Sequence, residues 1–124
     1  MSEIKYTESH EWLRLEDDGS ATVGITDFAQ TQLGDIVYVA LPSADDSFAQ
    51  DAEAATVESV KAAGEIKMPV AGTVLAINDA LNDAPNLVNE APQGDGWFFR
   101  MRIDAPEQLA GLMDEAAYQA YTRL

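Results

Sequence analysis

Short runs of β-branched and aromatic residues, each followed by turn-forming residues, constrain this chain more than any other feature of its sequence. Runs of this length are typical of strands rather than of amphipathic helices. We expect strands at 4–7, 11–15, 21–25, 35–41, 52–60, 65–68, 73–77 and 97–103. Many short strands with turns between them predict a mainly β fold, a small barrel or sandwich.

The helical signals are short. Thr26 is a good N-cap for a brief helix over 27–33, and Gly34 suits the left-handed residue that ends a helix. Pro85 favours a single helical turn over 84–88, because a proline does no harm in a first turn. Between the strands, 43–51 is predicted to be an acidic loop.

The tail predicts a helical cap. Asp104 and Glu107 have the D-x-x-E spacing of a capping box. Apolar residues then follow at helical spacing, namely Leu109, Leu112, Met113, Ala116, Ala120 and Leu124. Gly111 and Asp114 are positions at which the tail can divide into two helices. We expect this segment to pack on the β core.

Composition limits the possible partners. The 124 residues fit one domain, and the net charge of −15 argues against nucleic acid and anionic membranes as ligands. Proteins with basic docking surfaces are the expected partners. The chain has no cysteine, no apolar run of membrane-spanning length and no signal peptide at 1–5, so we expect a cytoplasmic protein. We also expect it to be a monomer.

The sequence offers no set of catalytic residues. Ser9, His10 and Glu11 are consecutive, and neighbours in an extended segment point to opposite faces, so they do not form a triad. One histidine without cysteine argues against zinc, and the acidic run 45–53 lacks the spacing of a calcium loop. Gly94-x-Gly96 precedes a strand, which argues against a phosphate loop. A carrier or binding module is therefore expected.

One lysine stands out. The chain has only three lysines among its residues, Lys5, Lys61 and Lys67, against 22 acidic residues. The segment 57–66 predicts two strands folded back on each other, with Lys61 exposed at the bend. A lysine amine at a hairpin tip is a candidate attachment point for a group that must reach outward. From these residues alone, an ordinary solvated turn lysine remains the alternative.

Several longer motifs, in matching order, resemble the glycine cleavage system H-protein family. They lie at 6–12, 23–30, 33–37 and 58–62, continue through 78–89 and 96–97, and extend the resemblance over roughly 4–123. The resemblance implies a barrel-sandwich hybrid like that of lipoyl and biotinyl carriers. It also implies one lipoyl-carrier domain over 1–124, with its core at about 20–103 and a C-terminal helical cap at about 105–123.

The resemblance also implies a cofactor and a site. Lys61 matches the lysine that bears lipoic acid in amide linkage, within a lipoylation motif of Glu58, Ser59, Val60 and Ala62. In the family, the loaded arm folds back into a surface cleft. Ser9, Glu11 and Glu65 match polar positions near that cleft and are expected to contact the aminomethyl-lipoyl arm.

The partners follow from the same resemblance. Lipoyl-Lys61 is expected to accept the aminomethyl group of glycine on a pyridoxal-phosphate-dependent glycine decarboxylase, with loss of carbon dioxide. It then visits a folate-dependent aminomethyltransferase, which releases ammonia, and a flavoprotein dihydrolipoamide dehydrogenase, which reoxidises it. Lipoate-attaching enzymes are the remaining expected partners.

Other readings remain open. A lipoyl relay that donates its group to other complexes, and an unmodified adaptor, are alternatives to the glycine cleavage role. A biotin carrier has a lysine flanked by methionines, which Lys67-Met68 half matches. Spacing argues against it, because in both carrier families the modified lysine lies eight residues before a proline, and Lys61 has that distance to Pro69.

The sequence departs from the family at three positions. Ala44 and Gln50 stand where glycines are common, and residues with a Cβ resist positive φ, so the 43–51 loop is expected to turn differently. Gly64 stands where a serine is common, which is expected to loosen the hairpin beyond Lys61.

Overall fold

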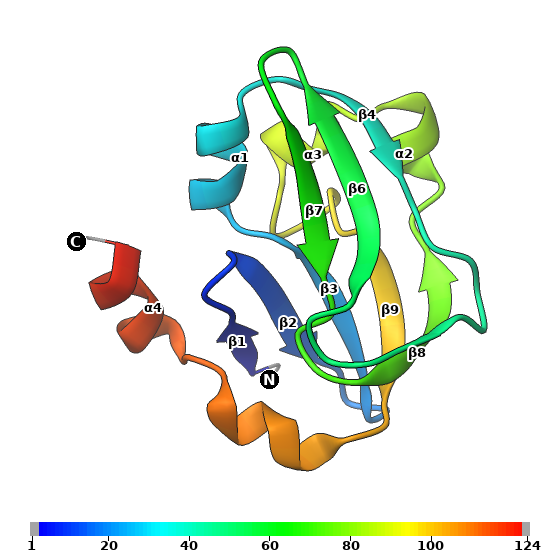
Figure 1. Cartoon of the computed structure of the whole chain (residues 1–124), viewed down its shortest axis with the longest axis vertical. Coiled ribbons are helices and arrows are strands. Elements are labelled where there is room, and N and C mark those ends of the chain that lie inside the picture. The colour runs from blue at the N-terminus through cyan, green and yellow to red at the C-terminus, as the bar shows by residue number, and fades with distance from the viewer. Residues whose placement is uncertain (1–2, 123–124) are drawn as a thin grey trace.

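The structure, a computed structural model, describes residues 3–122. Over these residues, strands form two antiparallel sheets that do not close into a barrel (Figure 1). The larger sheet has the order β1-β2-β3-β9-β8-β5, and the smaller one has the order β4-β6-β7. The strands are β1 Ile4–Tyr6, β2 Glu11–Leu15, β3 Ser20–Ile25, β4 Ile36–Ala40, β5 Ser47–Phe48, β6 Glu53–Ser59, β7 Ala63–Lys67, β8 Gly72–Ile77 and β9 Phe99–Ile103.

The helices are short. They are α1 Asp27–Leu33, α2 Ala80–Asp83, α3 Leu87–Glu90, the 3-10 helix η1 Pro106–Gly111 and α4 Glu115–Thr122. Helices of one or two turns are marginal alone, so packing must hold them. In Figure 1, α1 and α3 lie close to the upper end of the sheets, while η1 and α4 run along the lower left side.

Both sheets contribute to one hydrophobic core. Leu13 and Val74 of the larger sheet and Val57 and Ile66 of the smaller sheet are at most 1% exposed and belong to the same cluster. The alternation of buried and exposed residues along β6 and β7 therefore places one face of this hairpin on the core. The mainly β fold expected from the sequence is confirmed.

A second cluster attaches the tail. The rings of Tyr6 and Tyr118 are stacked, with centroids 4.5 Å apart. The Tyr118 hydroxyl also lies 2.7 Å from Thr26 Oγ1 and 2.8 Å from His10 Nδ1. Trp12 completes this cluster from β2. The tail is thus tied to the residues that begin β2 and α1.

The prediction for α1 is confirmed. Thr26 Oγ1 accepts a hydrogen bond from the N–H of Ala29 at 3.2 Å, as an N-cap should. Gly34 follows the helix with φ of 81°, a conformation that side chains with a Cβ resist. The cap at Thr26 and the stop at Gly34 both depend on neighbouring residues, and the folded structure keeps both.

The predicted capping box is wrong. Ala105, not Asp104, precedes η1, and it makes no side-chain cap. The Asp104 carboxylate instead accepts hydrogen bonds from Arg102 Nε at 2.8 Å and from Thr73 Oγ1 at 2.9 Å. Glu107 lies in η1 as an exposed residue. The Asp104 carboxylate therefore binds side chains of β8 and β9 instead of capping the helix.

The single apolar stripe of the tail is also wrong, although the division into two helices is confirmed. Ala116 and Ala120 are exposed, and Tyr118 is the buried residue of α4. Leu124, the last member of the predicted stripe, lies outside the described residues. Asp114 Oδ1 accepts a hydrogen bond from the N–H of Ala117 at 2.8 Å and so helps to begin α4.

Several element bounds differ from the expected ones. The 43–51 loop contains the two-residue strand β5, which pairs with β8, and α2 was not expected. The helical turn predicted at 84–88 lies at α3, and β9 begins two residues after Trp97. Such short elements depend on tertiary pairing, which local sequence does not report.

The 43–51 loop turns through residues next to the predicted positions. Positive φ falls on Asp45, at 75°, and on Asp51, at 69°. Aspartate tolerates this conformation better than most residues because its side chain can bond locally. Each lies one residue after Ala44 or Gln50, the positions at which the resembled family commonly has glycines.

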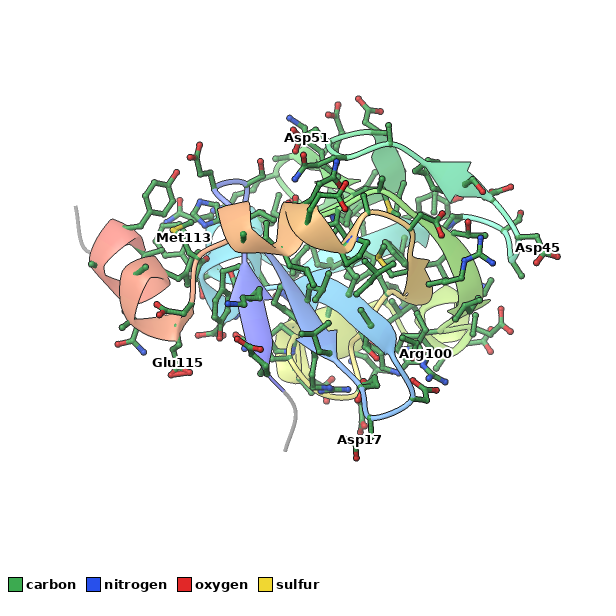
Figure 2. All side chains as sticks on the ribbon, turned by 90° about the horizontal axis from the view of Figure 1, so that it is seen from below. Asp17, Asp45, Asp51, Arg100, Met113 and Glu115 are labelled. Carbon is green, nitrogen blue, oxygen red and sulfur yellow. The ribbon has the colours of Figure 1, made fainter. Side chains whose placement is uncertain are left out.

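Charged side chains surround the molecule, and Figure 2 shows Asp17, Asp45 and Glu115 pointing outward at widely separated places. In the described part of the chain, no helix is long and apolar enough to cross a membrane. No group of three or more His, Cys, Asp or Glu side chains within residues 3–122 is placed to hold a metal ion.

Candidate functional site

Lys61 lies in the bend between β6 and β7. Glu58 and Ala63 are the last paired residues of the two strands, and the N–H of Ser59 donates to the carbonyl oxygen of Ala62 at 2.7 Å. Val60 and Lys61 are therefore the residues left at the tip, and both are exposed. The bend stands at the top of Figure 1, beside the link from α1 to β4.

The Ser59 side chain fixes this bend. Its Oγ accepts hydrogen bonds from the N–H of Ala62 at 3.0 Å and from that of Lys61 at 3.3 Å. The same hydroxyl donates to the Ala62 carbonyl at 3.0 Å. A serine that bonds backbone groups two and three residues ahead stabilises a turn. The backbone of Lys61 is thus held although its side chain is exposed.

A second support comes from outside the hairpin. The N–H of Val60 donates to the carbonyl oxygen of Asp35 at 3.0 Å. Asp35 lies between Gly34 and Ile36, in the link from α1 to β4. The tip is therefore attached to a segment about 25 residues earlier in the chain.

Asn89 of α3 holds that link in place. Its Oδ1 accepts the N–H of Ile36 at 2.8 Å, and its Nδ2 donates to the Gly34 carbonyl at 2.9 Å. Nδ2 also donates to Gln30 Oε1 at 2.9 Å. One amide side chain thus binds both neighbours of Asp35. The sequence analysis placed Asn89 in a matched motif but assigned it no role, because nothing local connects it with Lys61.

The Lys61 side chain lies against Gly34. A Cβ built on Gly34 would be 3.3 Å from Lys61 Cε and 3.8 Å from Cδ. Glycine at position 34 therefore leaves room for the Lys61 side chain and also allows the positive φ that follows α1. The space at Gly64 is similarly tight, with Leu33 Cδ2 and Val57 Cγ2 each 3.3 Å from a built Cβ. Glycine at this position therefore packs closely against both side chains.

A cleft of about 210 Å³ lies beside β7. Its lining is Ser9, His10, Ile25, Ala29, Gln32, Leu33, Gly64, Glu65 and Ile66. Ser9 and Glu65, which the sequence analysis singled out, are thus brought together at one cleft. Glu65 is four residues beyond Lys61, so about 13 Å of extended strand separates the two at most.

Glu11 does not line this cleft. Its side chain is 1% exposed, accepts a hydrogen bond from Thr7 Oγ1 at 2.5 Å, and accepts the N–H of Lys67 at 3.4 Å. Burial raises the pKa of the Glu11 carboxyl, and the bond from Thr7 opposes this shift. Contact between Glu11 and a loaded arm therefore stays a prediction.

His10 does not lie in the extended segment that the sequence analysis assumed. Its φ is 72°, and it follows a turn in which its N–H donates to the Thr7 carbonyl. The ring packs on Phe28, with centroids 4.6 Å apart, and bonds Tyr118. Burial lowers its pKa, so the neutral ring is favoured. His10 thus forms one wall of the cleft and joins it to α4.

Lys67, at the other end of β7, has different surroundings. It is half-buried, lies within a strand opposite Glu53, and its backbone N–H reaches the buried Glu11. No turn presents its side chain. The two lysines of this hairpin are therefore not equivalent.

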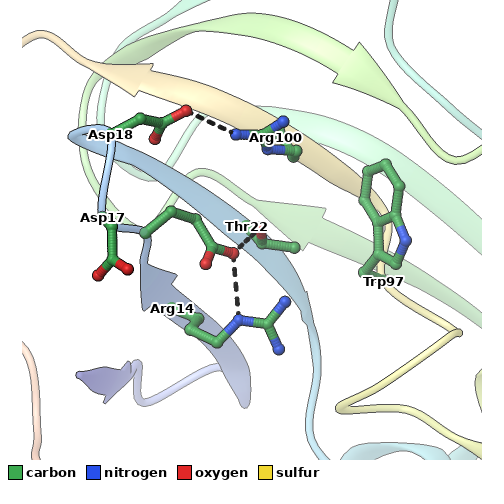
Figure 3. A pocket seen from close by; sticks show the side chains of 7 residues that line it. Arg14, Asp17, Asp18, Thr22, Trp97 and Arg100 are labelled. Atoms are coloured by element: carbon green, nitrogen blue, oxygen red, sulfur yellow. Dashed lines mark hydrogen bonds and ion pairs between the residues drawn. The ribbon is translucent and has the colours of Figure 1, made fainter. Parts of the chain in front are cut away.

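A larger hollow of about 500 Å³ lies on the outer face of β2, β3 and β9 (Figure 3). Its cations are paired: Arg14 Nε lies 3.1 Å from Glu16 Oε2, and Arg100 Nη2 lies 3.1 Å from Asp18 Oδ2. Trp97 stands at its side. Exposed ion pairs of this kind add little stability. Both arginines that line the hollow are thus already paired with acidic side chains.

Known proteins have similar sequences and a similar fold. The family model described as glycine cleavage H-protein matches residues 4–123. The chain belongs to this family. A "Glycine cleavage system H protein" of Psychrobacter sp. (strain PRwf-1) is 55% identical over 96% of this chain and 94% of the relative's. One of Chromobacterium violaceum is 56% identical over 94% and 91%.

The fold comparison agrees. A crystal structure of a glycine cleavage system H protein from Mycobacterium marinum has a TM-score of 0.90, with 29% identity and 98% coverage of both chains. Members of the glycine cleavage H-protein family are the lipoyl carriers of the glycine cleavage system and are not themselves catalytic.

Proposed function

We propose that Lys61 carries lipoic acid in amide linkage. The observation that supports this most is the exposed lysine on a bend fixed by Ser59 and by Asp35. An attachment point must be reachable by an enzyme and firmly based, so that its arm swings from a defined origin. Lys61 meets both requirements, whereas Lys67 lies within a strand. This difference also argues against a biotin attached at Lys67.

The lipoyl group would supply a disulfide that accepts the aminomethyl group of glycine. The protein's part is to present Lys61 in turn to glycine decarboxylase, aminomethyltransferase and dihydrolipoamide dehydrogenase, after lipoate-attaching enzymes have loaded it. Carrying one arm between sites makes successive reactions effectively intramolecular. The excess of acidic residues would speed encounters with basic partner surfaces at low salt.

We further propose that the loaded arm rests in the cleft beside β7. Leu33, Gly64 and Ile66 offer an apolar wall, while Ser9 and Glu65 offer polar groups for the amine of the cargo. Glu11 is the third proposed contact of the arm, although its buried carboxyl does not line this cleft. A single domain, a monomer and a cytoplasmic location complete the proposal.

The test is glycine decarboxylation in the reconstituted system. Lipoylated wild-type protein is expected to support the reaction, and Lys61→Arg is expected to abolish it, because a guanidinium cannot form the amide. Lys67→Arg is the matched control and should keep wild-type activity. Full activity of Lys61→Arg, or its loss in Lys67→Arg alone, would contradict the proposal.

A further inference from the structure

Large apolar side chains are exposed around the Lys61 bend. Val37 and Tyr38 are each 54% exposed, and Val60 is 68% exposed. We call these three residues the tip patch. In the described part of the chain, the other large apolar residues with comparable exposure are Leu75 of β8 and Tyr121 of α4. Apolar exposure is therefore concentrated at the tip.

A β-bulge exposes two of the three residues of the tip patch, Val37 and Tyr38. Ile36 pairs with Ser59 and Tyr38 pairs with Glu58, so Val37 is an extra residue on β4. In a regular strand, Val37 and Tyr38 would point to opposite faces, and one of them would be buried. The bulge leaves both exposed while Ile36 and Val39 on either side remain buried. The bulge therefore places two consecutive large apolar side chains on the surface.

The tip patch lies next to the bend that carries Lys61. Val60 precedes the lysine, and the pairing of Ile36 with Ser59 brings the start of β4 beside the bend. The bond between the N–H of Val60 and the Asp35 carbonyl fixes this arrangement. Asp35 and Glu58 are exposed next to the patch, and neither forms an ion pair within residues 3–122. The patch therefore has an acidic rim.

We propose that the tip patch is the docking surface for the enzyme that acylates Lys61. That enzyme must bring its active site to the lysine amine, so it must cover the residues beside the bend. The surface fits a partner with an apolar contact area bordered by basic side chains, in which Tyr38 fills a pocket. This inference rests on the proposed function, since it assumes that Lys61 is acylated.

The test measures lipoylation rates of the intact, unmodified protein with a purified lipoate ligase, lipoic acid and ATP. Tyr38→Ser and Val37→Ser are each expected to raise the KM for the carrier roughly tenfold, with kcat changed less than twofold. Tyr38→Phe keeps the apolar ring and should keep the wild-type KM. Leu75→Ser, which removes an exposed apolar side chain from the other sheet, is the matched control and should change neither value.

The charged rim gives a second readout. Asp35→Asn and Glu58→Gln are expected to raise KM at low salt and to make KM less sensitive to salt, because they weaken attraction to basic groups. Circular dichroism and thermal unfolding establish that each variant is folded. A wild-type KM for both serine variants would overturn the docking surface while leaving the proposed function intact.

Two other results would contradict the proposal in different ways. A wild-type protein that the ligase does not acylate would overturn the proposed function and this inference with it. A concentration-dependent dimer in sedimentation that Tyr38→Ser dissociates, with an unchanged KM, would assign the patch to contact between two copies and so contradict the proposal.

Discussion

Lys61 precedes β7 and Lys67 is the last residue of that strand. The two lysines are six residues apart, yet their surroundings differ. Lys61 is on a bend whose backbone bonds Ser59 and Asp35, and its side chain extends over a glycine. Lys67 is half-buried in a paired strand over a buried carboxylate. Residue type is the same in both. Backbone presentation is what distinguishes an attachment point from an ordinary strand lysine.

Moving the lysine by one residue should have the largest effect. The double variant Lys61→Ala, Ala62→Lys keeps the charge but moves the lysine side chain to residue 62. The N–H and the carbonyl oxygen of that residue are both hydrogen-bonded to Ser59. We expect the lipoylation rate to fall at least about a hundredfold, because misplacing a reacting group by even about 1 Å can have that effect. Rates are measured by intact mass against time. Modification of residue 62 at the wild-type rate would show that presentation is not decisive.

Removing the support under the bend should have the next largest effect. Asn89→Ala deletes three hydrogen bonds, to Gln30, Gly34 and Ile36, and frees the link that holds Val60. We expect faster amide hydrogen exchange at Val60 and a roughly tenfold lower kcat/KM for lipoylation, which corresponds to about 1.4 kcal/mol.

Asn78→Ala is the control for that variant. Asn78 is buried, and its amide donates to Asp95 and Trp97 at 2.8 Å each, away from the Lys61 bend. It should lower the free energy of unfolding to a comparable extent without changing exchange at Val60. Equal losses of kcat/KM in the two variants would mean that Asn89 acts through stability alone.

Removing the Ser59 hydroxyl should have a smaller effect on the lipoylation rate. Ser59→Ala removes the acceptor shared by Lys61 and Ala62, while the bond from the Ser59 N–H to the Ala62 carbonyl remains. A net loss of about 1 kcal/mol would lower the lipoylation rate about fivefold. Ser59→Thr retains the hydroxyl and should restore most of the rate. Equal rates for the alanine and threonine variants would exclude a role for this oxygen.

The Lys67 end of β7 should instead show a pH effect on stability. Burial raises the pKa of Glu11 above its ordinary 4.5, so the folded state binds this proton more tightly than the unfolded state. This contribution is fully present below the ordinary pKa and is lost as the pH rises through the folded-state pKa. Glu11→Gln should therefore flatten the pH dependence of the free energy of unfolding above pH 4.5. Parallel curves for the two proteins, measured by urea denaturation, would be inconsistent with a raised pKa.

The sequence predicted those features of the two lysines that depend on nearby residues. The bend at Lys61 follows from β-branched runs and small residues around it, and α1 follows from Thr26 and Gly34. The support from Asn89 and the bulge at Val37 could not be predicted. Both depend on pairing between segments distant in sequence, and a bulge shifts register without a local signal.

The same limit explains the errors. Asp104 has the right spacing for a cap, but Arg102 and Thr73 bind it once β8 and β9 pair. His10 was taken as extended, whereas the turn at Thr7 places it against Phe28 and Tyr118. In both regions a local pattern was overridden by contacts that form only in the folded chain.

The most direct test of the account is to map the modified residue. The unmodified protein is incubated with lipoic acid, ATP and a lipoate ligase, digested, and analysed by peptide mass spectrometry. We predict one lipoyl group per chain, on Lys61, with Lys67 unmodified. A lipoyl group on Lys67, or none on a folded protein under conditions that modify another lipoyl carrier, would contradict the account.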